Sequence, residues 1–171
     1  MKILALDSSG LVASVAIIAD GTLLAEYTVN YKKTHSQTLL PMLDEIARMV
    51  ELDRKTIDAI AVAAGPGSFT GLRIGSATAK GLGLALGKPI IEVPTLAGIA
   101  YNLVFVRGLV CPVMDARRQQ VYSGIYRFEG DRLITVRDQT PVSVTDLIAE
   151  PWEGGRGLTG DGRPDLEGGA S

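Results

Sequence analysis

Two aspartates, Asp7 and Asp115, directly follow short apolar runs that are typical of buried strands. In two-lobe nucleotide-binding proteins built from a duplicated unit, acidic loops at such strand ends face the nucleotide and hold its phosphates or its metal ion. An aspartate at a strand end also commonly caps its own loop in an Asx-turn. The loop after Asp7 continues with Ser8 and Ser9 and is poor in the glycines and threonines of a good phosphate loop. The sequence leaves both interpretations open.

A second candidate loop, residues 65–70, precedes a predicted helix. Free backbone N–H groups and the helix dipole favour an anion at such a helix start. The loop lacks the Gly-Lys-Ser/Thr ending of a Walker loop, however, and Pro66 removes one backbone donor. A rigid turn that sets the direction of the helix is the alternative. The candidate nucleotide contacts are Asp7, Ser8, Ser9, Gly65, Gly67, Ser68 and Asp115.

The chain has a single histidine, His35, and a single cysteine, Cys111. One histidine excludes a two-histidine metal site within this chain, and no nucleophile-elbow pattern accompanies it. One cysteine excludes an intrachain disulfide and suits a reducing compartment. We therefore predict no catalytic residue and no metal ligand, and we expect both side chains to have structural roles.

The helix expected over residues 70–86 carries unusually small side chains. Gly71, Gly75, Ala79 and Gly83 recur every fourth residue and so form one stripe along the helix. Each interior glycine costs roughly 1 kcal/mol of helix propensity relative to alanine. A sequence that accepts this cost needs another backbone to come close. We predict that the stripe is a docking face for a partner; close packing inside a single lobe would explain the same spacing.

Alternating strands and helices must position these residues. Asp20-Gly21 is a strong hairpin signal between two strands, and Thr38 is the expected N-cap of the first helix. Strands are predicted at 2–6, 12–19, 22–29, 57–64 and 89–93, with helices at 38–52, 70–86 and 95–104.

The pattern of strand, aspartate, strand, turn and strand then begins again at 110–114. We interpret this as a duplicated lobe and predict an α/β fold of two mixed sheets flanked by helices. The expected boundaries are a first lobe at 1–106, a partial second lobe at 107–162 and a disordered tail at 163–171. The second lobe looks incomplete, because the chain after residue 150 is rich in glycine, proline and charge.

Composition limits the partners. The net charge is -2 and no run of Lys or Arg exceeds two residues, so no electrostatic groove for tRNA or DNA is visible. The apolar start before Asp7 is too short for a signal peptide, and no uncharged apolar run reaches membrane-spanning length. We expect a cytoplasmic protein without a membrane partner.

Segments spread over almost the whole chain resemble the TsaB (YeaZ) family. The most specific of them is GPGSFTGLRIG at 65–75. The matching stretches are ILALDSS at 3–9, HSQTLLPML at 35–43, AVAAGPGSFTGLRIG at 61–75, AKGLGLAL at 79–86, PTLAGIA at 94–100, MDARRQQVY at 114–122 and GDG at 160–162.

The resemblance implies the RNase H-like fold of actin, hexokinase and Hsp70 and a non-catalytic role in making N6-threonylcarbamoyladenosine at position 37 of tRNA. It implies docking on the catalytic paralogue TsaD, a homodimer when alone, assembly with the ATPase TsaE, and tRNA contact only through the complex. We expect no cofactor in this chain itself, and the sequence leaves open whether a nucleotide, ATP or ADP, binds at the junction with the partner. The implied partner-binding residues are Leu39, Met42, Leu43, Ile46, Gly71, Leu72, Arg73, Gly75, Ser76, Ala79, Lys80 and Gly83.

Two other functions compete with this one. A small ATP-binding phosphotransferase or ATPase of the same fold would use Asp7, Asp115 and the loop 65–70. A metallopeptidase fails on the histidine count. Members of the family usually continue well past the GDG segment, which here is followed only by residues 163–171.

Overall fold

The computed structural model describes residues 1–30 and 35–149 and the backbone of 156–160. It divides into two compact units, Met1–Pro94 and Thr95–Ser171, and each is described by itself. The predicted tail at 163–171, with Asp161 and Gly162, lies outside the described residues. In the described part of the chain, no helix combines the length and the apolar character needed to cross a membrane.

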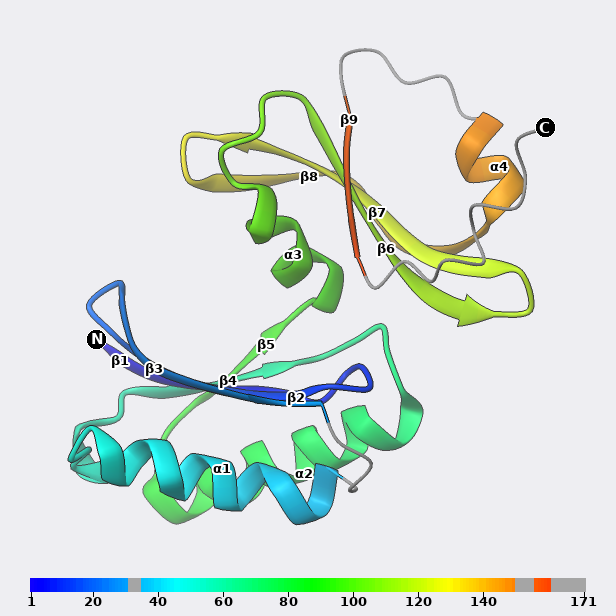
Figure 1. Cartoon of the computed structure of the whole chain (residues 1–171). Coiled ribbons are helices and arrows are strands. Elements are labelled where there is room, and N and C mark those ends of the chain that lie inside the picture. The colour runs from blue at the N-terminus through cyan, green and yellow to red at the C-terminus, as the bar shows by residue number, and fades with distance from the viewer. Residues whose placement is uncertain (31–34, 150–155, 161–171) are drawn as a thin grey trace. The chain divides into compact units, whose positions relative to one another are not determined.

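The first unit is built on a five-stranded mixed sheet (Figure 1). The Asp20-Gly21 hairpin forms as predicted, with φ of 49° and 79° at its two residues. Strand β1 pairs antiparallel with β2 and parallel with β4, and β4 pairs parallel with β5. The order is β3-β2-β1-β4-β5, with bounds β1 Lys2–Asp7, β2 Ala13–Ala19, β3 Thr22–Val29, β4 Ala59–Ala63 and β5 Ile90–Val93.

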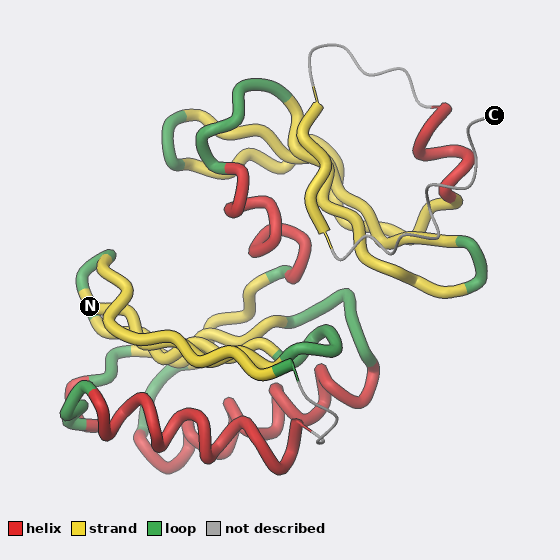
Figure 2. The backbone as a smooth tube through the Cα atoms, viewed as in Figure 1, coloured by secondary structure: helices red, strands yellow, loops and turns green. Residues whose placement is uncertain are grey.

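Two long helices, α1 (His35–Met49) and α2 (Phe69–Leu86), cover the same face of this sheet (Figures 1 and 2). A short 3₁₀ helix, η1 (Arg54–Thr56), connects α1 to β4. The core forms between the helices and the sheet, and α2 contributes only the small side chain of Ala79 to its fully buried part. Its buried members include Leu4, Leu6, Val15, Ile17, Leu39, Met42, Leu43, Ile46, Ile60 and Val62.

The first helix begins three residues before the predicted start. Thr38 is therefore not its N-cap but lies inside the helix, where its hydroxyl donates to the carbonyl of His35 at 3.4 Å. The His35 ring fixes this end, because Nε2 donates to the carbonyl of Gly10 at 3.0 Å. Pro41 also lies inside the helix.

The second unit contains a four-stranded sheet with a helix on each face. Leu96 and Ala100 of α3 pack against Val110, Met114 and Tyr126 of the sheet. On the other face, Leu147 of α4 packs against Cys111 and Val121. The order is β8-β7-β6-β9, with bounds α3 Thr95–Ala100, η2 Tyr101–Leu103, β6 Leu109–Arg117, β7 Gln120–Glu129, β8 Arg132–Ser143, α4 Val144–Ala149 and β9 Arg156–Gly160.

The two sheets share one topology, which confirms the predicted repeat. In each, an antiparallel meander of three strands is joined by a strand parallel to the first, β4 beside β1 and β9 beside β6. The units divide after Pro94 rather than after Val106, because α3 belongs to the core of the second sheet.

The core position of Leu39 gives a direct test of α1. Leu39 is 1% exposed, so Leu39→Ala should lower the free energy of unfolding by about 2–5 kcal/mol, through lost burial and the cavity left behind. Leu40, its neighbour on the same helix, is 52% exposed, and Leu40→Ala should change stability by less than about 0.5 kcal/mol. Urea denaturation of both variants measures the difference. Equal losses would contradict the assigned orientation of α1.

Candidate functional site

The small-residue stripe of α2 faces inward, onto the sheet of its own unit. Gly71, Gly75, Ala79 and Gly83 are all buried. A Cβ built on Gly71 would lie 2.0 Å from the carbonyl oxygen of Ser8, far inside contact distance. A Cβ on Gly83 would lie 3.1 Å from Cγ1 of Ile90. The prediction that this stripe docks a partner is therefore wrong, and the alternative of close packing inside one lobe holds.

The residues of α1 that were expected to bind a partner are also core residues. All four are less than 9% exposed and pack against the sheet, because their spacing places them on the inner face of the helix. The four are Leu39, Met42, Leu43 and Ile46.

Ser8 and Ser9, in the loop after β1, pack closely against the start of α2. The Ser8 hydroxyl donates to the carbonyl oxygen of Gly71 at 2.9 Å, and the Ser68 amide donates to the carbonyl oxygen of Ser9 at 2.6 Å. A Cβ on Gly67 would lie 2.4 Å from that same Ser9 oxygen. Ser68 also caps α2, since its Oγ accepts from the amide of Gly71 at 3.2 Å. These contacts give the candidate phosphate loop a structural role.

The two candidate aspartates cap their own loops in the same way. Asp7 Oδ1 accepts from the amide of Ser9 at 2.8 Å, and Asp115 Oδ1 accepts from the amide of Arg117 at 2.7 Å. Both are Asx-type contacts, as the structural interpretation of these residues predicts. Both carboxylates are solvent-exposed, and they belong to different units.

The single histidine and the single cysteine each form a hydrogen bond within their own unit. The His35 ring bonds to the Gly10 carbonyl, and the buried Cys111 thiol shares a hydrogen bond of 3.0 Å with the Ser123 hydroxyl. Over residues 1–30 and 35–149, no three side chains of the types His, Cys, Asp and Glu come together as they would to hold a metal ion.

The opposite side of α2 is open. Phe69, Arg73, Ala77 and Gly81 also recur every fourth residue, offset by two from the buried stripe, and Leu84 continues the row. We call this row the outer face of α2. Phe69 and Leu84 are 73% and 88% exposed, and a Cβ on Gly81 would have no described residue beyond the adjoining helix backbone within 4 Å. The sequence shows both rows equally, and only the packing distinguishes them.

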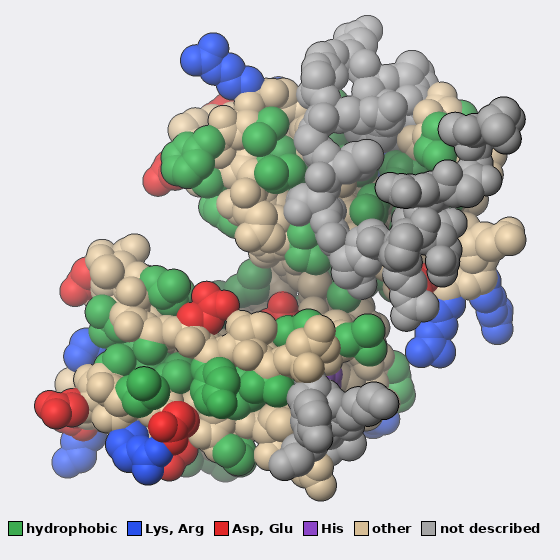
Figure 3. Space-filling model, in the orientation of Figure 1, with side chains coloured by type: hydrophobic (Ala, Val, Ile, Leu, Met, Phe, Trp, Pro, Cys, Tyr) green, Lys and Arg blue, Asp and Glu red, His purple; other side chains and the backbone are tan. Residues whose placement is uncertain are grey.

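Of the predicted partner-binding residues, those that stay accessible lie on the outer face of α2 or next to it. Arg73 and Lys80 are exposed, and Leu72 and Ser76 are half-buried. Further exposed apolar side chains of this unit are Leu23 and Tyr27 of β3 and Leu40 of α1. Figure 3 shows hydrophobic side chains gathered on one face of the unit.

The close contact at Gly75 predicts an energetic coupling with Ser8. A Cβ on Gly75 would lie 2.4 Å from Ser8 Oγ, whereas its next neighbour, Val62 Cγ2, would be at 3.6 Å. Gly75→Ala should therefore displace the Ser8 hydroxyl and cost about 1–3 kcal/mol of stability. In a Ser8→Ala background the clash is absent, so the same change should be neutral or stabilising. A double-mutant cycle from urea denaturation measures the coupling.

Two glycines serve as controls. Gly71→Ala meets a backbone oxygen, so Ser8→Ala should not rescue it. Gly81→Ala has free space and should stabilise the protein by up to about 1 kcal/mol. If Gly75→Ala lowered the free energy of unfolding equally with and without the Ser8 hydroxyl, the predicted coupling would be wrong.

Known proteins are similar to this chain in sequence and in architecture. The model of a family described as "TsaD: tRNA N6-adenosine threonylcarbamoyltransferase" matches residues 22–161. A "tRNA threonylcarbamoyladenosine biosynthesis protein TsaB" of Bacillus subtilis is 37% identical over 86% of this chain and 65% of its own length. Its Escherichia coli namesake is 38% identical over 74% of this chain and 55% of its own length.

Among solved structures, "YeaZ from Pseudomonas aeruginosa" superposes with a TM-score of 0.80 at 31% identity, covering 90% of this chain and 71% of that one. This match confirms the predicted α/β fold with mixed sheets and flanking helices. The chain spans 65% and 55% of the lengths of the two curated relatives. On the family model, the curated relatives and the solved structure together, the chain belongs to the TsaB (YeaZ) family.

Proposed function

We propose that this chain is a non-catalytic subunit in the synthesis of N6-threonylcarbamoyladenosine in tRNA and that it acts by docking on the catalytic paralogue TsaD. The names of the curated relatives support the pathway. The observation that carries the docking role is the outer face of α2, which is exposed over the length of an 18-residue helix.

The outer face has the properties of a helix-packing surface. Phe69 and Leu84 offer exposed apolar area at its two ends. Between them, Ala77 and Gly81 let a partner helix approach closely, as small residues do at helix contacts. When two helices pack, large apolar side chains of one helix are buried against the apolar surface of the other. The same face would pair two copies of the chain when TsaD is absent.

The polar candidates support a non-catalytic role. Ser8, Ser9 and Ser68 are used in contacts that hold α2 against β1, and Asp7 and Asp115 cap their own loops. In this proposal TsaD carries out the catalysis, and this chain contacts tRNA only through the complex. TsaE joins the complex, and a nucleotide binds at the junction between this chain and TsaD. The competing phosphotransferase function predicts ATP binding by the isolated chain that Asp7→Ala weakens.

Gly81 offers a test that leaves the fold intact. Gly81→Arg places a long charged side chain in the middle of the outer face, where no described residue outside the adjoining helix backbone comes within 4 Å of the new Cβ. We expect this variant to melt at or above the temperature of the parent and to lose binding to TsaD by at least about a hundredfold, because a partner helix can no longer approach. Isothermal titration with purified TsaD measures the affinity.

The matched control is Gly81→Ala, which changes the same position without a protruding side chain and should bind TsaD as the parent does. Undiminished binding by Gly81→Arg would refute docking on this face.

A further inference from the structure

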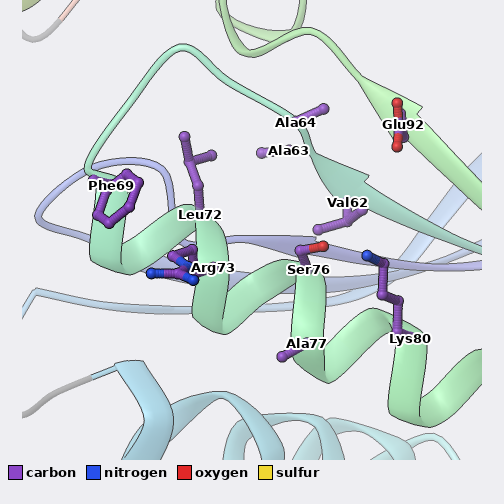
Figure 4. A pocket seen from close by; sticks show the side chains of 10 residues that line it. All are labelled: Val62, Ala63, Ala64, Phe69, Leu72, Arg73, Ser76, Ala77, Lys80 and Glu92. Atoms are coloured by element: carbon purple, nitrogen blue, oxygen red, sulfur yellow. The ribbon is translucent and has the colours of Figure 1, made fainter.

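A groove of about 460 Å³ runs beside α2 within the first unit. Val62, Ala63 and Ala64 line it from the end of β4 and the residue after it, and Glu92 lines it from β5 (Figure 4). Its other side is α2. The groove is distinct from the buried stripe, because none of the four stripe residues lines it.

The α2 side of the groove carries two cations. Arg73, Ser76 and Lys80 are spaced three and four residues apart and line the groove together. Figure 4 shows Ser76 and Lys80 directed toward Val62, with Arg73 next to Phe69. The Arg73 guanidinium carbon lies 5.0 Å from the centroid of the Phe69 ring, a cation–π contact that orients the guanidinium at one end of the groove.

The positive charge of this helix is not balanced by its own acids. The sequence of α2 contains Arg73 and Lys80 and no aspartate or glutamate, so neither cation has an acidic partner three or four residues away. The ion pairs between described residues join other side chains and do not include these two. Glu92 alone is acidic among the lining residues, which leaves the groove with a surplus of positive charge.

The groove adjoins the outer face of α2, since Phe69, Arg73 and Ala77 belong to both. A partner that docks on the outer face therefore also covers the groove. Covering an ammonium or a guanidinium without an anion is costly, because the charge loses its water and gains no partner. The covering surface must supply negative charge.

We infer that the groove is an electrostatic anchor of the docked complex, in which acidic side chains of the partner protein enter and pair with Arg73 at one end and Lys80 at the other. The inference rests on the proposed docking of TsaD and adds the charge of the partner's matching surface. Charge pairs of this kind mainly raise the rate of association and select the partner.

The test compares two charge reversals with the same change in net charge. Lys80→Glu reverses a groove cation, whereas Lys55→Glu reverses an exposed lysine on η1 that does not line the groove. Binding of each full-length variant to TsaD is measured by isothermal titration at low salt and at about 1 M salt, where the screening length falls to about 3 Å. We expect Lys80→Glu to weaken binding at least about tenfold at low salt, Lys55→Glu to have little effect, and the gap to narrow at high salt.

Three outcomes would be informative in different ways. Equal binding by Lys80→Glu and Lys55→Glu, together with lost binding by Gly81→Arg, would overturn the anchor and leave the docking face standing. Unchanged binding by Gly81→Arg would refute docking on the outer face of α2, on which the anchor depends. Inorganic phosphate that binds the isolated chain, and that Lys80→Glu releases while TsaD binding is unchanged, would assign the groove to a small anion and overturn the anchor.

Discussion

The first unit depends on one unusually close contact, between helix α2 and the loop that follows strand β1. At Gly71 and Gly75 the helix backbone lies so near Ser8 that a single added carbon would overlap an oxygen. The hydroxyl of Ser8 bonds to the helix carbonyl, and the Ser9 carbonyl accepts the amide of Ser68. Glycine is required here because no other residue leaves room for this approach.

This contact gives the two sides of α2 separate tasks. Because the residues on the inner side of α2 are small, the helix backbone packs closely against β1 and β4. Ala79 therefore reaches the core although its side chain has only one carbon. The outer face is freed from core packing and can carry Phe69, Arg73 and Leu84 in the same 18 residues, with Lys80 exposed beside it. Docking, in this account, is a property of the side of the helix that the fold does not use.

Much of this architecture follows from the sequence, and the failures have physical causes. The end of β1 at Asp7, the Asp20-Gly21 hairpin and the duplicated meander are local signals, and all are present in the structure. The predicted strand end at Asp115 is wrong, because β6 continues to Arg117, where the ladder with β7 still pairs Arg117 with Gln120. The side of α2 that faces the sheet is not a local signal, because two rows with the same four-residue spacing compete and only the sheet decides between them. The start of α1 is not a local signal either. His35, where the helix begins, is held by the carbonyl of Gly10, a residue distant in sequence, so the prediction that the helix starts at Thr38 is wrong.

The most direct test of the central claim is the thiol reactivity of a Leu84→Cys variant, alone and with saturating TsaD. Leu84 is 88% exposed, and the native Cys111 is buried, so labelling reports the new thiol. We expect fast labelling of the free chain at low concentration and strong protection in the complex with TsaD. Equally fast labelling in a complex that light scattering shows to be fully formed would contradict it, because the outer face of α2 would then lie outside the interface.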